Sequence, residues 1–225
     1  MAALAKLSRP RLAGVYPRER LFARLDECRR HAAVWISGPP GAGKTTLAAS
    51  WLDARGLRAL WYQVDAGDGD PASFFYHLGL GAKQAGLSRK THLPLLTPEY
   101  LPDLAGFTRR YFRALCHGLP QPCVLVLDNV QDASDAPAFT AVVRDALAEI
   151  PQGMNALLLS RTEPPAAHAR LLASRATIEL GWDELRLTAE EAAQIAGNGA
   201  GAPALGINSL LERCDGWAAG PDPVA

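Results

Sequence analysis

Cysteine is scarce in this sequence, since only Cys28, Cys116, Cys123 and Cys214 occur among its 225 residues. Their spacing is not that of a disulfide framework or a zinc site, and the five histidines are scattered along the chain. The sequence therefore argues against structural zinc and favours a protein of the reducing cytoplasm.

Long apolar runs and net charge are also missing. No run approaches the length of a membrane-spanning helix, and Lys6 and Arg9 interrupt the N-terminus before a signal-peptide segment appears. The formal net charge is zero, so the overall field gives no reason to expect binding to nucleic acid or to anionic membranes. A chain of this length has room for one α/β domain and a small appendage.

The sequence does contain a phosphate-binding motif. Residues 38–46 fit the pattern of glycine, four residues, glycine, lysine and then serine or threonine. The apolar run 32–37 before them predicts a buried strand, and 47–52 after them predicts a helix. The predicted nucleotide-binding residues of this loop are Gly38, Pro39, Pro40, Gly41, Ala42, Gly43, Lys44, Thr45 and Thr46.

The residue types of this motif follow from its chemistry. Glycine permits backbone conformations in which successive N–H groups bind phosphate oxygens at the positive end of the following helix. Lys44 would then reach the β and γ phosphates, and the hydroxyl of Thr45 would be a ligand of Mg²⁺. A chance glycine-rich turn would need neither residue at these positions.

Four further apolar runs, at 60–65, 123–128, 156–160 and 176–180, alternate with helical patterns. We therefore predict an α/β fold of the P-loop NTPase type, with a five-stranded parallel sheet covered by helices on both faces. The expected divisions are an N-terminal arm at 1–16, a nucleotide-binding domain at 17–183 and a truncated helical extension at 184–225. Thr188 and Glu191 have the spacing of a capping box, which predicts that a helix begins in this extension.

Two polar residues follow predicted strands and should share the carboxyl edge of the sheet with the loop. Asp128 would complete a magnesium site with Thr45, because Mg²⁺ prefers hard oxygen ligands. Arg161 would contact a γ-phosphate through its guanidinium, and a solvated arginine at a strand end is the alternative. The predicted catalytic set is Lys44, Asp128, Asn129 and Arg161.

Asn129 stands where many ATPases carry a second carboxylate. An amide orients a water molecule but cannot accept its proton, so hydrolysis should be slow unless another base serves. Asp132 is one such base, or else an ordinary turn residue. Asp65, Asp68 and Asp70 are further acidic candidates, although capping of the helix that follows explains Asp70 completely.

Short segments spread over nearly the whole chain form an ordered set. They are residues 6–10, Val15, 18–21, 38–46, 60–65 with 67–68, 125–128, 158–161, 187–188 with 190–192, and 216–220. This set resembles the nucleotide-binding module of the MalT-like signal-transduction ATPases. These are STAND-class modules found at the N-terminus of large LuxR-type bacterial transcription activators.

The resemblance implies an ATP-operated switch. ATP and Mg²⁺ would bind between the sheet edge and the C-terminal helical region, ADP would hold a resting form, and ATP with an inducer would favour self-assembly. The strand bearing Arg161 would lie between the loop strand and the Asp128 strand, and Val15 and Arg18 would lie near the adenine. The implied partners are the nucleotide and either further copies of the chain or a separate regulatory protein.

Two departures from the family pattern limit what the resemblance implies. Family members usually have two acidic residues where this chain has Asp128 and Asn129, which affects hydrolysis rather than binding. After 216–220 the family continues into a helix, whereas Pro221 and Pro223 follow here. Because the effector-sensing and DNA-reading domains are missing from the sequence, we expect no direct DNA binding by this chain.

Two other functions stay open at this point. A small-molecule P-loop kinase would need a lid with cations, and only the segment 86–102, with Arg89 and Lys90, offers room for one. A degenerate interaction module would bind nucleotide weakly or not at all. The expected activity is therefore slow Mg²⁺-dependent ATP hydrolysis or none.

Overall fold

The computed structural model describes residues 5–12 and 14–198 of the chain. Residues 216–220, which contribute to the MalT-like pattern, lie outside the described residues, as does the rest of the extension from 199 onward. The predicted division into arm, nucleotide-binding domain and extension stays a prediction.

Five strands form one parallel sheet in the order β2-β3-β4-β1-β5. They are β1 (Ala33–Ser37), β2 (Arg58–Gln63), β3 (Cys123–Asp128), β4 (Asn155–Ser160) and β5 (Thr177–Leu180). β1, β3 and β4 are buried along their whole length, as continuous apolar runs predict. The predicted α/β fold with a five-stranded parallel sheet is confirmed, and β4 lies between β1 and β3 as the resemblance implies.

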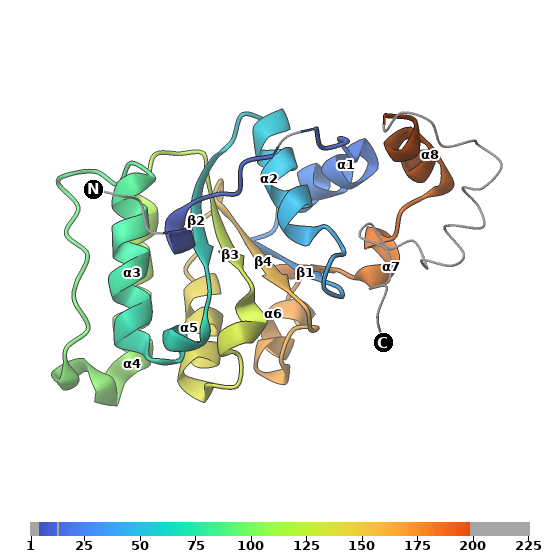
Figure 1. Cartoon of the computed structure of the whole chain (residues 1–225). Helices are drawn as coiled ribbons and strands as arrows, with labels where there is room; N and C mark the ends of the chain where they lie inside the picture. The colour runs from blue at the N-terminus through green and yellow to red at the C-terminus, as the bar shows by residue number, and fades with distance from the viewer. Residues whose placement is uncertain (1–4, 13, 199–225) are drawn as a thin grey trace.

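Helices cover both faces of this sheet (Figure 1). The α-helices are α1 (Glu19–Cys28), α2 (Lys44–Ala54), α3 (Pro71–Gln84), α4 (Leu104–Gly118), α5 (Pro137–Leu147), α6 (Ala169–Ala173), α7 (Trp182–Leu185) and α8 (Ala189–Asn198). Short 3₁₀ segments occur at η1 (Ala5–Leu7), η2 (Ala66–Gly69), η3 (Pro98–Asp103), η4 (Val130–Ala133) and η5 (Ala166–His168). The sequence did not predict α6 and α7, because four or five residues are too few to show helical periodicity.

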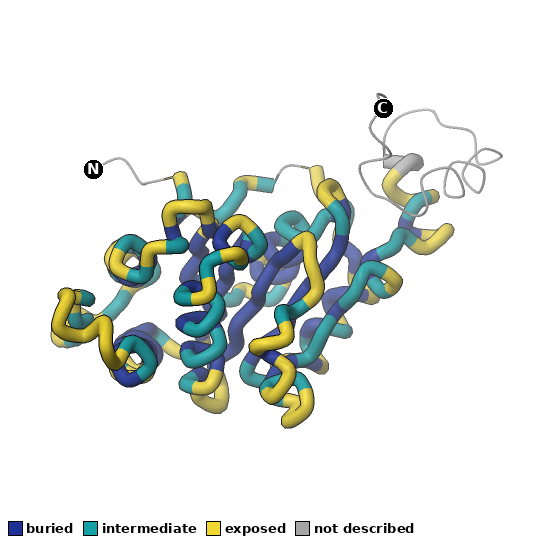
Figure 2. Tube along the Cα trace, turned by 90° about the horizontal axis from the view of Figure 1, so that it is seen from below, coloured by how far each residue is buried: buried dark blue, intermediate teal, exposed yellow. Residues whose placement is uncertain are grey.

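The core consists of one apolar layer on each face of the sheet. Neighbouring residues of β1 enter opposite layers, since Trp35 belongs to the apolar layer that includes residues of α3, α4 and α5, while Ile36 belongs to the layer that includes residues of α1 and α2. This alternation follows from the two-residue period of a strand. Figure 2 shows the strands as a buried interior with exposed residues gathered on the outer helices and loops.

The N-terminal segment is anchored on β2. Nζ of Lys6 lies 2.8 Å from Oδ2 of Asp65 and 2.9 Å from Oδ2 of Asp68. Asp68 is fully buried and also accepts a hydrogen bond from the hydroxyl of Tyr62 at 2.6 Å. Asp65 and Asp68 therefore hold the segment in place, and Asp70 caps α3 as predicted. From this anchor the chain runs past α2 to α1 (Figure 1).

Candidate functional site

The phosphate-binding motif forms the connection between β1 and α2. Gly41 and Gly43 have φ angles of 77° and 80°, in the left-handed region that favours glycine. The first N–H groups of α2 have no partner within the helix, which makes this helix end suited to an anion. The predicted order of strand, loop and helix is present.

The side chain of Lys44 folds back onto this loop. Its Nζ donates hydrogen bonds to the carbonyl oxygens of Gly38 at 2.6 Å and Pro39 at 2.9 Å. Burial lowers the pKa of Lys44, as does the charge of Arg161, while Asp128 opposes the shift. The local electrostatics therefore favour an anion beside the two cations.

The two predicted metal ligands meet at the carboxyl edge of the sheet. The hydroxyl of Thr45 lies 3.1 Å from both Oδ1 and Oδ2 of Asp128. Burial raises the pKa of Asp128. Hydrogen bonds from Thr45 and from the N–H of Asn129 lower this pKa in part, as does the charge of Lys44. A buried carboxylate beside a hydroxyl supplies the hard oxygen ligands that Mg²⁺ prefers.

Asn129 forms the turn that ends β3. Its φ of 60° and ψ of 42° place it in the left-handed conformation, and it precedes η4. Asparagine adopts this conformation more readily than most residues. The residue therefore has a backbone role in addition to its predicted position beside the nucleotide.

Arg161 follows β4, between the loop strand and the Asp128 strand, and is exposed. Its backbone N–H donates to Oε1 of Gln131 at 2.9 Å, and Nε2 of Gln131 donates to Oδ1 of Asp132 at 2.8 Å. Gln131 thus connects the turn after β3 with the end of β4. The sequence did not predict this role, and its only indication was the position of Gln131 two residues after Asn129.

A cavity of about 360 Å³ lies beside the loop, and we call it the base cavity. Its walls include Val15 and Arg18 from the segment before α1, Leu47 of α2, Leu187, and Ile195 of α8. Mostly apolar walls with a few polar groups suit a flat heterocycle. The structure therefore brings Val15 and Arg18 beside the loop, where the resemblance implies contact with adenine.

On another side of the loop lies a larger and more polar recess, of about 690 Å³. Its lining includes Pro39, Arg161, Glu163 and Glu179, and the hydroxyl of Ser37 donates to Glu179 at 3.0 Å. The loop thus separates an apolar recess from a polar one. Four carboxylates, including those of Asp183 and Glu184, line this second recess and disfavour phosphate groups there, so the phosphates of a nucleotide are expected at the loop itself.

Arg18 joins the base cavity to the C-terminal extension. Its Nη2 donates to Oε2 of Glu191 and to the carbonyl oxygen of Arg186, both at 2.9 Å. The predicted capping box is confirmed, because the N–H of Thr188 donates to Glu191 at 3.1 Å and that of Glu191 donates to Oγ1 of Thr188 at 3.2 Å. The sequence predicted the cap but not the ion pair with Arg18.

The sequence is similar to that of curated bacterial regulators, although no family model matches it. It is 32% identical over 194 residues to the HTH-type transcriptional regulator MalT of Cronobacter sakazakii, covering 84% of this chain and 21% of the relative. It is 31% identical over 220 residues to the MalT regulator of Serratia proteamaculans, covering 95% of this chain and 24% of the relative. The chain therefore spans less than a quarter of the length of these two relatives.

Solved structures of other proteins share this fold, and two of them are similar as follows. A STAND protein with a tetratricopeptide repeat sensor from Pyrococcus horikoshii is similar with a TM-score of 0.60 and 20% identity, over 94% of this chain and 30% of that one. The Aeropyrum pernix ORC1 protein, solved in complex with DNA, is similar with a TM-score of 0.51 and 17% identity, over 83% of this chain and 50% of that one. Within the described residues, no helix has the length and apolar character needed to cross a bilayer.

Proposed function

We propose that this chain, which is similar in sequence to part of the MalT regulators and in fold to a STAND protein, is a MalT-like P-loop module that binds ATP with Mg²⁺ and acts as a nucleotide-operated regulatory switch. The observation that carries this proposal is the contact of Thr45 with both carboxylate oxygens of Asp128 at the end of the glycine loop. Regulation of transcription, which the names of the longer relatives describe, is proposed as the process that the switch serves.

The residues of the site fit a magnesium nucleotide. Thr45 and Asp128 would hold the metal, and the left-handed conformations of Gly41 and Gly43 shape the loop in the way that phosphate binding requires. Bound Mg²⁺ would neutralise phosphate charge. Lys44 would exchange its contacts with the loop carbonyls for contacts with phosphate oxygens. Its ammonium group would then have a negatively charged partner.

Arg161 is proposed to distinguish ATP from ADP. It follows the strand between β1 and β3, and its charge is close enough to lower the pKa of Lys44. A γ-phosphate would attract both cations, whereas ADP would leave Arg161 without this partner. The difference gives the module two states that depend on the nucleotide.

We propose that ATP hydrolysis is slow, because the turn after β3 offers no suitable general base. The amide of Asn129 cannot take a proton from an attacking water molecule. Asp132 is exposed and already accepts a hydrogen bond from Gln131. A switch of this kind would hold its ATP state for a long time compared with an efficient ATPase.

The output of the switch is proposed to be association with further copies of this chain or with a separate regulatory protein. The zero net charge gives no electrostatic support for direct binding to DNA or to a membrane.

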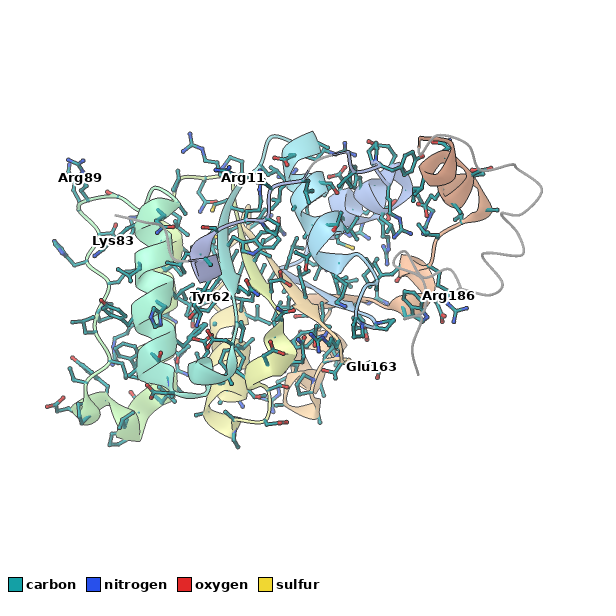
Figure 3. The ribbon with its side chains drawn as sticks, viewed as in Figure 1. Arg11, Tyr62, Lys83, Arg89, Glu163 and Arg186 are labelled. Atoms are coloured by element: carbon teal, nitrogen blue, oxygen red, sulfur yellow. The ribbon has the colours of Figure 1, made fainter. Side chains whose placement is uncertain are left out.

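The alternative of a small-molecule kinase finds no support at the segment 86–102. Leu93 and Leu96 pack against the core, and this segment leads from α3 to α4 on the β2 side of the sheet. β2 is three positions away from β1, which carries the loop. Figure 3 accordingly shows Arg89 at the left edge of the molecule, well away from Glu163, which lines the recess beside the loop.

Titration calorimetry with Mg-ATP and Mg-ADP, with phosphate release followed in parallel, tests the proposal. Binding by the wild type that is lost in Lys44→Ala, with slow release, would support the switch. If the wild type binds neither nucleotide at millimolar concentration, the proposal fails. Loss of the γ-phosphate only when a metabolite is supplied would instead indicate a kinase.

A further inference from the structure

One buried ion pair joins the segment before α1 to the start of α8. Arg18 is 9% exposed and Glu191 is 6% exposed, and Nη2 of Arg18 lies 2.9 Å from Oε2 of Glu191. Desolvation of two charges offsets most of their attraction, so a buried pair is weak evidence for a role in stability. Its position beside the base cavity points to a role in binding.

Glu191 is the centre of this connection. Besides Arg18, its Oε2 accepts hydrogen bonds from Nη2 of Arg20 at 3.3 Å and from the N–H of Thr188 at 3.1 Å. Burial opposes ionisation, but these donors hold the pKa of Glu191 below its usual value. One carboxylate therefore fixes the N-terminal end of α8 and two arginines at the other end of the described chain.

The ion pair leaves polar atoms of both side chains unused. Nε of Arg18 and Oε1 of Glu191 are buried and have no hydrogen-bond partner among the described residues. Such atoms cost free energy unless a partner arrives. Arg18 lines the base cavity, where a ring nitrogen of a base would be a suitable acceptor for the remaining donors of its guanidinium.

We propose that Glu191 is a positioning residue for the base cavity. Through Arg18 it holds the wall that receives the nucleoside part of a bound nucleotide, and it couples that binding to the seating of α8 against α1. This inference rests on the proposed function. The coupling is reciprocal, because a base that binds more tightly when α8 is seated also stabilises the seated position of α8.

The chain provides two matched controls. Glu184 accepts a hydrogen bond from Nε of Arg24 at 3.1 Å, so Glu184→Gln weakens another contact between α1 and the extension without changing Arg18. Thr188→Ala removes the other half of the capping box and leaves the charge of Glu191 in place. These variants separate a general loosening of the extension from loss of the Arg18 contact.

The test compares Mg-ATP with Mg-tripolyphosphate, which has the phosphates but no base, by calorimetry on the 225-residue chain. We expect Glu191→Gln to weaken ATP binding about tenfold, or about 1.4 kcal/mol, and to leave tripolyphosphate binding within about twofold. Arg18→Met should have a similar effect, and the double variant should lose little more than either single one. Glu184→Gln should bind both ligands as the wild type does, and Thr188→Ala, which keeps the Arg18 contact, should weaken ATP binding clearly less than Glu191→Gln does.

Hydrogen exchange at the backbone amides of α8 provides a second readout. ATP should slow this exchange in the wild type and not in Glu191→Gln, whereas tripolyphosphate should slow it in neither. Equal weakening of ATP and tripolyphosphate in Glu191→Gln, or the same selective loss in Glu184→Gln, would overturn the inference. Failure of the wild type to bind either ligand would instead refute the proposed function.

Discussion

The hydroxyl of Thr45 lies 3.1 Å from each carboxylate oxygen of Asp128, although 83 residues separate the two in the sequence. The contact exists because all strands of the sheet are parallel, so the residues that follow β1 and those that end β3 lie at the same edge. Neither segment has this geometry alone. The site is therefore a product of the strand order.

Asp128→Asn should abolish most of the effect of Mg²⁺ on ATP binding. The amide has nearly the same size as the carboxylate but no charge. We therefore expect the ratio of ATP affinities with and without Mg²⁺ to be about tenfold smaller in the variant than in the wild type, a difference of about 1.4 kcal/mol. The measurement is an ATP titration with Mg²⁺ and with a chelator. An unchanged Mg²⁺ effect would remove Asp128 from the metal site.

The same site should respond to pH. Because burial raises the pKa of Asp128 and a metal ligand must be deprotonated, Mg²⁺ affinity should fall as the pH is lowered toward that pKa. Lys44→Met should make the fall begin at a higher pH, since the charge of Lys44 favours the ionised carboxylate. A wild-type Mg²⁺ affinity that stays constant down to about pH 4, near the usual pKa of aspartate, would contradict this prediction.

The sequence predicted those parts of the site that lie within one short segment of the chain. The loop at 38–46 was recognisable from the spacing of its glycines, lysine and threonine, and the strand before Asp128 from its continuous apolar residues. The contact of Gln131 with the N–H of Arg161 joins residues 30 apart, and that of Arg18 with Glu191 joins residues 173 apart. Neither pair has a local pattern, because the strand order and the packing of α8 bring their members together.

Gln131→Leu should reduce the preference for ATP over ADP. Leucine keeps most of the bulk but removes the acceptor of the Arg161 N–H, so the end of β4 loses a hydrogen bond that fixes Arg161. We expect the ratio of the two affinities to fall about fivefold, or about 1 kcal/mol. Calorimetry with both nucleotides measures this ratio.

Asp132→Asn is the matched control for this prediction. Asp132 accepts a hydrogen bond from the amide nitrogen of Gln131, whereas the Arg161 N–H donates to the amide oxygen. Its nucleotide preference should remain that of the wild type. If both variants change the ratio equally, the turn after β3 acts as a whole and the bond to Arg161 has no separate role.

The stability of the fold should decrease in mild acid because of His168. This residue is 1% exposed, its ring lies 5.5 Å from that of Trp35, and neither ring nitrogen has a partner among the described residues. Burial, and then the charge of Arg144, lower the pKa of His168. The unfolded chain therefore binds a proton below about pH 6.5 that the folded chain does not, and the free energy of unfolding falls by at most about 1.4 kcal/mol per pH unit.

Urea unfolding at about pH 7.5 and about pH 5.5, on either side of the usual histidine pKa, measures this loss. His168→Phe keeps an aromatic ring against Trp35 and cannot titrate, so its stability should change less between the two pH values. His117, exposed on α4, provides the control variant His117→Gln, which should behave as the wild type. An unchanged pH dependence in His168→Phe would show that other groups cause the loss.

Asn129→Asp should accelerate ATP hydrolysis. Aspartate tolerates the left-handed conformation at this position, so the turn after β3 should be retained. A carboxylate here can accept the proton of an attacking water molecule, and general-base catalysis typically contributes at least about 100-fold. We expect phosphate release to rise by about this factor, with Asn129→Gly as the control because glycine keeps the backbone conformation and supplies no base. If Asn129→Asp releases phosphate no faster than Asn129→Gly, the missing carboxylate is not what limits hydrolysis in this chain.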